Sequence, residues 1–368
     1  MPDPNCLRST IARWCQALTG WFACLAAALL ALTMGAVSAQ TPTPHKLRIV
    51  GGLAGVNQYV QHEEPFWSRT LEQRSAGRFK AEIVPFDRAG VPAQDMLRLM
   101  QIGVIPFGTV QISRVAAQDA EFSAADLAGL NPDIATLRKT VAAFRPYLEN
   151  TLRQRYGIEL LAIYVYPAQM VFCNHPITQL SDLAGQRVRA SGTTVADFLQ
   201  AFGATPVVTS MVEVLTRLRN GNVNCAVTGT MTGNTLGLHT VTTHIYAMPI
   251  TWGLSFFAAN RDSWIALEPD LRIMLRDELP RLEARIWDAS ERETQEGLAC
   301  NTGAPACRDG KKGNMTLAPM TEQDNQRRQQ VLQSHILPHW LRRCGPDCAP
   351  IWNRTIGPVH GIIMQGKP

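Results

Sequence analysis

Apolar and polar positions from residue 186 to residue 227 follow an order that predicts strand, helix, strand, helix and strand. The first strand covers 186–191, and apolar side chains then recur at the spacing of an α-helix from 195 to 202. A β-branched run at 205–209 and a last strand at 223–227 enclose the second helix. Strands joined through helices in this way form a mainly parallel sheet covered by helices.

Arg189 stands near the carboxyl end of the first of these strands. The turn and N-cap residues at 191–194 follow it and open the next helix. Ligands of open α/β sheets bind at this edge, and the free N–H groups of a helix start attract anions. We therefore predict that Arg189 holds a carboxylate or a phosphate. Arg187 lies on the same side of the strand and competes for this role.

The same order of elements occurs earlier in the chain, between residues 46 and 112. Strands are predicted at 46–51, 79–84 and 104–112, with helices at 56–74, broken by Pro65, and at 93–102. Two such units predict two similarly wound lobes. Glycines follow the first strand with the spacing GGxxG. A dinucleotide site has the spacing GxGxxG, so we interpret these glycines as a tight turn.

Two predicted crossings join the lobes. A helix at 134–156, which Pro146 should break, leads into a strand at 158–165. The chain then crosses to the second lobe at 165–170 and returns through strands at 245–260. Such a pair of strands would act as a hinge.

The remaining pattern completes the domain assignment. Residues 228–243 read as loops and turns, and 264–298 as a long amphipathic helix that Pro280 kinks. A surface loop at 300–314 and a helix at 322–341 follow. We therefore assign residues 45–165 and 255–290 to lobe I, 166–254 and 291–345 to lobe II, and 346–368 to a C-terminal tail.

Residues 1–39 have the three parts of a secretory signal: two arginines, an apolar run from 17 to 34, and small residues at 37 and 39. The run also approaches the length that spans a membrane, so an uncleaved anchor is the alternative. The proline-rich stretch that follows favours cleavage after Ala39. We expect the mature chain in the periplasm.

Charge and composition limit the classes of function. The chain has 368 residues, 46% of them hydrophobic and 18% charged, which favours two domains. Removing residues 1–39 removes Arg8, Arg13 and Asp3, so the net charge falls from +5 to +4. This charge is too small to indicate a nucleic-acid partner. No G-x-S-x-G, P-loop or H-E-x-x-H motif occurs, and we expect no cofactor.

Six cysteines remain after the signal, and an even number in an exported chain predicts disulfides. Proximity in sequence pairs Cys300 with Cys307 and Cys344 with Cys348, which leaves Cys173 and Cys225 as the third pair. Together with His335 and His339, the cysteines at 344 and 348 could instead bind zinc. An oxidising compartment favours the disulfide, so we expect no metal.

Several stretches of the sequence resemble one known family. They are DLAGQRVR at 182–189, FGATPV at 202–207, LRNGNV at 218–223 and AGRFK at 76–80. In these stretches the chain resembles the solute-binding subunits of tripartite ATP-independent periplasmic (TRAP) transporters, the DctP-like receptors. The resemblance implies a type II periplasmic-binding fold, with two α/β lobes joined by hinge strands and a long helix that spans both.

The resemblance also implies a function. Such a receptor closes its cleft over a small organic acid and delivers it to the membrane permease subunits of the transporter. We expect a monomer that binds its ligand without enzymatic turnover. The alternatives are the ligand-binding component of a sensor system and a periplasmic enzyme that acts on an organic acid.

The resemblance assigns a role to Arg189, which matches the arginine that forms a bidentate salt bridge with the ligand carboxylate. Other positions that could line the pocket are Gln111 and Arg114 after the first-lobe strand, Met211 and Thr228 in the second lobe, His175 and Trp252. Of these, His175 stands where the family often has a basic residue. Trp252 is near the predicted hinge.

Overall fold

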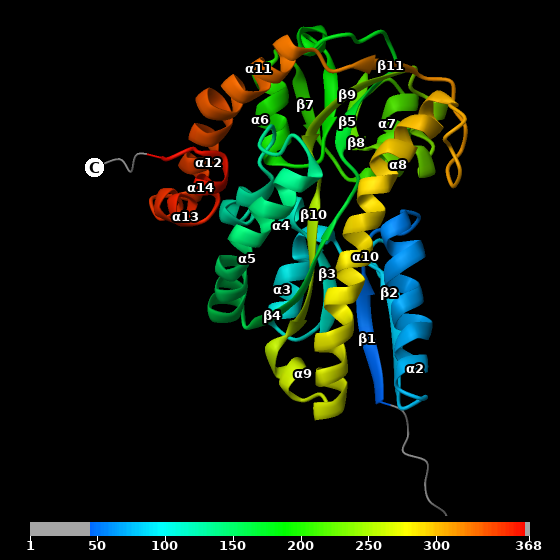
Figure 1. Ribbon diagram of the computed structural model, residues 1–368, viewed down its shortest axis with the longest axis vertical. Helices are drawn as coiled ribbons and strands as arrows, with labels where there is room; N and C mark the ends of the chain where they lie inside the picture. The colour runs from blue at the N-terminus through cyan, green and yellow to red at the C-terminus, as the bar shows by residue number, and fades with distance from the viewer. Residues whose placement is uncertain (1–44, 365–368) are drawn as a thin grey trace, which may run out of the picture. The chain divides into compact units, whose positions relative to one another are not determined.

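Two β-sheets, one in each lobe, form the framework of the computed structural model, which describes residues 45–364 (Figure 1). The predicted signal segment at 1–39 lies outside the described residues. Within residues 45–364, no helix has both the length and the apolar character needed to cross a membrane.

The sheet of lobe I contains five strands in the order β2-β1-β3-β10-β4. The strands are β1 (His45–Gly51), β2 (Phe79–Pro85), β3 (Phe107–Gln111), β4 (Ile158–Val165) and β10 (Leu254–Asn260). β1 is parallel to both β2 and β3, whereas β10 is antiparallel to β3 and β4. Residues of both faces are buried in β3 and β10, as expected for strands covered on each side, whereas one face of β1 and β2 carries exposed charged residues such as Arg48 and Glu82.

The sheet of lobe II contains six strands in the order β11-β9-β5-β8-β6-β7. The strands are β5 (Gln169–Cys173), β6 (Arg187–Ala190), β7 (Thr205–Val208), β8 (Cys225–Gly229), β9 (His244–Thr251) and β11 (Thr316–Pro319). β6 is parallel to β7 and β8, with α6 (Thr193–Ala201) and α7 (Met211–Arg219) as the connections. The predicted strand, helix, strand, helix, strand unit is therefore confirmed.

The chain passes between the lobes at the two predicted crossings. β4 leads into β5, and β9 leads back into β10. In the pairing of these strands, Val165 lies opposite Leu254 and Gln169 lies opposite Thr251. A third connection is α10 (Pro269–Thr302), which packs on β4 of lobe I and on α8 (Thr230–Thr235) of lobe II (Figure 1). The predicted fold class, with hinge strands and a long helix spanning both lobes, is confirmed.

Two prolines predicted to break helices do not. Helical turns continue across Pro65 through η1 (Gln58–Glu63), η2 (Phe66–Thr70) and α2 (Leu71–Arg74), and α5 (Ile134–Tyr156) continues through Pro146. Pro146 and Ala142, four residues before it, both face solvent. Water can therefore satisfy the carbonyl that loses its helical hydrogen bond. The other helices of lobe I are η3 (Ala93–Asp95), α3 (Met96–Gln101), α4 (Ile112–Val115), η4 (Ala120–Asp126) and α9 (Arg261–Ile265).

The prediction of loops throughout 228–243 was wrong, because this stretch contains α8 and the short helix η6 (Leu238–Thr240). The sequence of α8, TMTGNT, has low intrinsic helix propensity. Tertiary contacts stabilise it: Thr230 donates hydrogen bonds to two carbonyls of α10, and Asn234 donates to the carbonyl of Lys311. At the closest approach, a Cβ at Gly297 would lie 2.3 Å from the backbone nitrogen of Met231.

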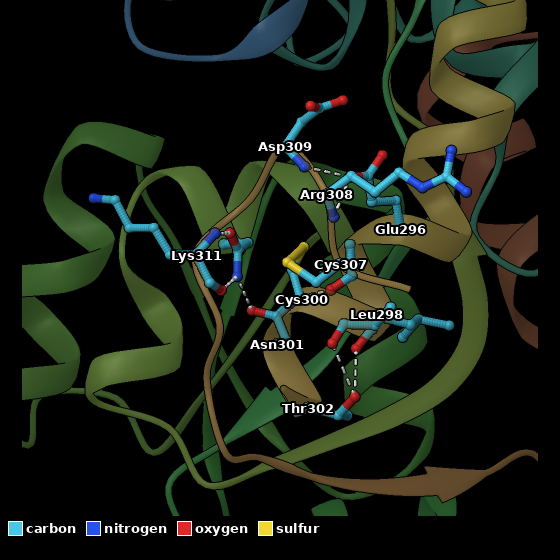
Figure 2. Close-up of a disulfide and its surroundings, with 12 residues drawn as sticks. Glu296, Leu298, Cys300, Asn301, Thr302, Cys307, Arg308, Asp309 and Lys311 are labelled. Atoms are coloured by element: carbon cyan, nitrogen blue, oxygen red, sulfur yellow. Dashed lines mark hydrogen bonds between the residues drawn. A yellow bond between two sulfur atoms is a disulfide. The ribbon is translucent and has the colours of Figure 1, made fainter. Parts of the chain in front are cut away.

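All three predicted disulfides are present, joining Cys173 to Cys225, Cys300 to Cys307 and Cys344 to Cys348. The second of them closes the loop that follows α10 (Figure 2). In this loop, the Glu296 carboxylate accepts hydrogen bonds from the backbone N–H groups of Arg308 and Asp309. The predicted surface loop is therefore fastened to α10 at several points.

The C-terminal helices contact both lobes. They are α11 (Glu322–Val331), η7 (Leu332–Ile336), α12 (Leu337–Cys344), α13 (Cys348–Arg354) and α14 (Ile356–His360). η7 packs on α6 of lobe II, while Trp340 of α12 donates a hydrogen bond to the carbonyl of Ala120 in lobe I. α14 packs on α5 of lobe I. The segment predicted as a tail is thus largely helical.

Candidate functional site

Two adjoining cavities lie where the lobes meet, beside the crossing strands. The larger, here called the arginine cavity, has a volume of about 70 Å³. It is lined by Leu53, Val56, Gln111, Ser113, Arg114, Tyr166, Gln169, Arg189, Ser191, Met211, Thr228, Gly229, Thr232, Gly253 and Leu254. Of the seven predicted site residues, the structure brings five together in this lining, namely Gln111, Arg114, Arg189, Met211 and Thr228.

Arg189, the third residue of β6, is 4% exposed. Its Nε donates a hydrogen bond to the carbonyl of Thr209 over 3.1 Å, and its Nη1 donates to the carbonyl of Val227 over 2.7 Å. Two neutral acceptors therefore hold the guanidinium in place, and its remaining N–H groups are left for a guest. Burial, and secondarily the charge of Arg114, lower the pKa of Arg189 to about 9.

Arg114 approaches the same point from lobe I. It belongs to α4, which follows β3, and its Nη2 donates to the carbonyl of Thr209 over 3.1 Å. Thr209 belongs to lobe II, so this hydrogen bond connects the lobes. Burial lowers the pKa of Arg114, and Glu213 partly opposes this effect. Two cations from opposite lobes thus converge on one carbonyl oxygen.

The other predicted residues form polar and apolar parts of the wall of the arginine cavity. Gln111 is the last residue of β3, and Thr228 of β8 is buried. The Thr228 hydroxyl donates a hydrogen bond to the sulfur of Met211 over 3.4 Å. No aspartate or glutamate lines the arginine cavity among the described residues. Its chemistry is therefore that of a site for an anion with a partly apolar body.

The smaller cavity, here called the second cavity, has a volume of about 40 Å³. Its polar lining includes Ser191 and Thr194 at the start of α6, Asp126 of η4 and Arg343 of α12. Asp126 accepts hydrogen bonds from the Thr251 hydroxyl over 2.6 Å and from the backbone nitrogens of the two residues at the return crossing. Burial raises the pKa of Asp126 to about 6.

A family profile decides what kind of protein carries this cleft. The profile described as "Bacterial extracellular solute-binding protein, family 7" (DctP) matches residues 53–337. The chain belongs to this family.

A curated relative of this family 7 protein has low sequence identity to it. The chain is 22% identical over 174 residues to "Uncharacterized protein YiiZ" of Salmonella typhimurium, a match that covers 44% of the chain and 52% of that relative. The match therefore spans about half the length of the curated relative.

Solved structures match over much more of the chain. DctP7, a Bordetella pertussis extracytoplasmic solute receptor binding pyroglutamic acid, superposes with a TM-score of 0.75 at 20% identity, over 84% of this chain and 98% of that chain. A TRAP periplasmic solute-binding protein from Rhodoferax ferrireducens with bound malonate superposes with a TM-score of 0.71 at 16% identity, over the same shares. At these identities the likeness shows the two-lobed fold.

Two predicted site residues of the family 7 protein lie away from both cavities. His175 follows the far end of β5. Trp252 is buried at the return crossing, where its indole nitrogen donates a hydrogen bond to the carbonyl of Asn131 over 3.1 Å. The side chain of Trp252 thus packs in the protein interior, whereas its neighbours Thr251 and Gly253 line the cleft.

Neither cluster of histidine and cysteine offers a set of metal ligands. Side-chain ligand atoms of Cys173, His175 and Cys225 lie within 4.8 Å of one another, but both sulfurs belong to the disulfide. The sulfurs that follow His335 and His339 are likewise paired in a disulfide. Disulfide sulfurs lack the thiolate charge that binds zinc.

The sequence prediction missed several lining residues. Tyr166 and Gln169 lie in the crossing that the pattern located at 165–170, and Ser191 and Thr194 lie in the turn after the strand of Arg189. Their position at a predicted hinge and at a predicted helix start was the available signal. Arg343 is different, because nothing local to α12 indicates that it reaches the cleft.

Proposed function

We propose that this protein is an exported receptor that captures a small carboxylate in the cleft between its lobes. The observation that carries the proposal is the convergence of Arg114 and Arg189, from opposite lobes, on the carbonyl of Thr209. The cavity contains one buried cation, Arg189, and one half-buried cation, Arg114, and no carboxylate lines it, which creates a need for negative charge. A bound carboxylate would supply it and would accept charge-assisted hydrogen bonds from both lobes.

Closure of the cleft follows from the same geometry. Without an anion, the charges of Arg114 and Arg189 repel each other, which opposes the approach of the lobes. With an anion between them, each lobe is attracted to the ligand. The acid would bind the closed state more tightly than the open state, and its binding would therefore shift the protein toward closure. The two sheets would move as the two lobes assigned from the sequence, with the strand crossings as pivots.

Family membership and the relatives support the physiological part of the proposal. Similar receptors bind pyroglutamic acid and malonate, both of which carry carboxylates. We propose that the chain acts in the periplasm as a monomer after cleavage of residues 1–39, and that it delivers its ligand to the membrane subunits of a TRAP transporter. In this role it would release the ligand unchanged.

Mass spectrometry of the small molecule that co-purifies with the protein tests this proposal. A thermal-shift panel of monocarboxylates, dicarboxylates, 2-oxo acids, sugar acids and aromatic acids should follow, because a ligand stabilises the folded state that binds it. We expect at least one carboxylate to raise the melting temperature and to be recovered without chemical change. Stabilisation by uncharged sugars alone, or conversion of the acid to a product, would contradict the proposal.

A further inference from the structure

The second cavity contains hydroxyl groups that have no hydrogen-bond partner among the described residues. Ser191 and Thr194 are each 8% exposed, and neither hydroxyl makes a hydrogen bond within residues 45–364. Both line the cavity at the start of α6, whose cap residue, Gly192, supplies no side-chain hydrogen bond. The first N–H groups of a helix also lack helical partners. The α6 side of the cavity therefore offers donors to a guest.

The cation that lines the second cavity already has an anionic partner. Nη1 and Nη2 of Arg343 lie 3.2 and 2.5 Å from the two carboxylate oxygens of Asp197, so this cation has its anion. Asp126 also lines this cavity, and its carboxylate accepts hydrogen bonds from three groups of the return crossing, which are the Thr251 hydroxyl and the backbone N–H groups of Trp252 and Gly253. A second anion would meet the charge of Asp126 without a free cation. A guest ammonium would meet the positive end of α6.

One ligand can occupy both cavities, because they share Ser113, Gln169, Ser191, Gly253 and Leu254 as walls. We propose that the second cavity is a subsite for an uncharged group that both donates and accepts hydrogen bonds, such as a carboxamide or a lactam. Its acceptor would face the hydroxyls and N–H groups of α6, and its donor would face Asp126. This inference rests on the proposed function, since it takes the carboxylate of the same ligand to lie in the arginine cavity.

Calorimetry with four matched acids tests the subsite. Succinamate, succinate, 4-aminobutanoate and pentanoate share a carboxylate on a short chain and differ in the distal group, which is a carboxamide, a carboxylate, an ammonium and a methyl group. We expect succinamate to bind about tenfold or more tightly than each of the others, the effect of roughly one hydrogen bond. Equal or tighter binding of succinate or 4-aminobutanoate would overturn the inference.

Variants locate the effect in the second cavity. Thr194→Val keeps the shape of the side chain and should weaken succinamate binding about tenfold while leaving pentanoate binding unchanged. The control is Thr216→Val, an exposed position on α7 that should change neither. Asp126→Asn should reduce the difference in affinity between succinate and succinamate, because it removes the negative charge that repels the distal carboxylate of succinate. Retention of the full preference in Thr194→Val and Asp126→Asn would contradict the subsite.

Failure of the subsite and failure of the proposed function give different results. If all four acids bind with the same affinity and all need Arg189, the carboxylate site stands and the subsite does not. If none of the four acids binds while another carboxylate of the thermal-shift panel does, the carboxylate site again stands and the subsite inference fails. If binding of the acids persists in Arg189→Met, the proposed function fails, and the subsite inference fails with it.

Discussion

Replacement of Arg189 by methionine should weaken ligand binding strongly without unfolding the protein. Methionine keeps an unbranched chain in the buried position and removes the charge and all five N–H donors. Because Arg189 already donates to Thr209 and Val227, its remaining donors can form two hydrogen bonds with a carboxylate. Hydrogen bonds to charged groups contribute roughly 1.5 to 3 kcal/mol each, so the dissociation constant should rise about 100-fold to 10,000-fold.

The same substitution should change the stability of the ligand-free protein only slightly. Burial lowers the pKa of Arg189 from 12.5 to about 9, so the folded state holds this proton less tightly than the unfolded state. For a base, this cost is fully present below pH 9 and disappears only as the pH rises toward 12.5. It amounts to on the order of 5 kcal/mol at neutral pH. Methionine relieves this cost but leaves two carbonyls without donors, at roughly 1 to 3 kcal/mol each.

These opposing contributions nearly cancel, so the free energy of unfolding should change by less than about 3 kcal/mol. Urea unfolding without ligand measures this change, and calorimetry with the co-purified acid measures binding. Arg187→Met is the matched control: Arg187 lies on the same strand, is exposed and donates to the carbonyl of Gly221. It should affect neither quantity by more than about 1 kcal/mol. A loss of binding below tenfold in Arg189→Met would refute the anchor, and a large loss of stability would show a structural role.

Three further predictions concern stability, and urea unfolding measures each. Replacing Cys173 and Cys225 by alanine should lower the free energy of unfolding by roughly 4 kcal/mol, because this disulfide closes a long loop, with a separation of 52 residues. Loss of the disulfide between Cys300 and Cys307, with a separation of 7, should lower it by about 2 kcal/mol. Equal effects would contradict the dependence on loop length. Gly297→Ala should destabilise by about 1 to 3 kcal/mol through contact with the backbone of Thr230 and Met231, although helix propensity favours alanine. A stabilised variant would contradict the close packing. Burial raises the pKa of Glu293 to about 7, so the cost of its charge is absent below about pH 4.5 and complete above pH 7. Glu293→Gln should therefore stabilise at pH 8 and have little effect at pH 4, and an equal effect at both would count against this burial.

Arg189 could be found from the sequence because its information is local. A strand, an arginine near its end and a turn rich in serine and threonine lie within a few residues of one another. Period-2 and period-3.6 patterns predict these elements, and the parallel sheet then fixes the edge at which they meet. Gln111 and Arg114, which follow the corresponding strand of lobe I, were predicted to line the pocket from the resemblance to the family, and their place after a strand is likewise local.

The features that were missed depend on distant parts of the chain. α8 is helical because α10 and Lys311, more than 60 residues away in sequence, accept its hydrogen bonds. The second cavity combines η4, the start of α6 and α12, and Arg343 reaches it from the C-terminal helices. No residue pattern within any one of these segments indicates that they meet in the folded protein. His175 illustrates the opposite error, because a basic residue expected at the pocket follows the strand end that points away from it.

The return crossing joins these parts of the site into one mechanism. Between β9 and β10 the backbone nitrogens of Trp252 and Gly253 donate to the carboxylate of Asp126. Gly253 has a φ of 77°, in the left-handed region, and a Cβ there would lie 2.4 Å from the side-chain nitrogen of Gln169. A side-chain acceptor at a break between strands lets the backbone change direction without leaving buried N–H groups unpaired. Because Gly253 and Gln169 also line both cavities, the proposed ligand would contact the crossing itself, and its binding would thereby bias the angle between the lobes.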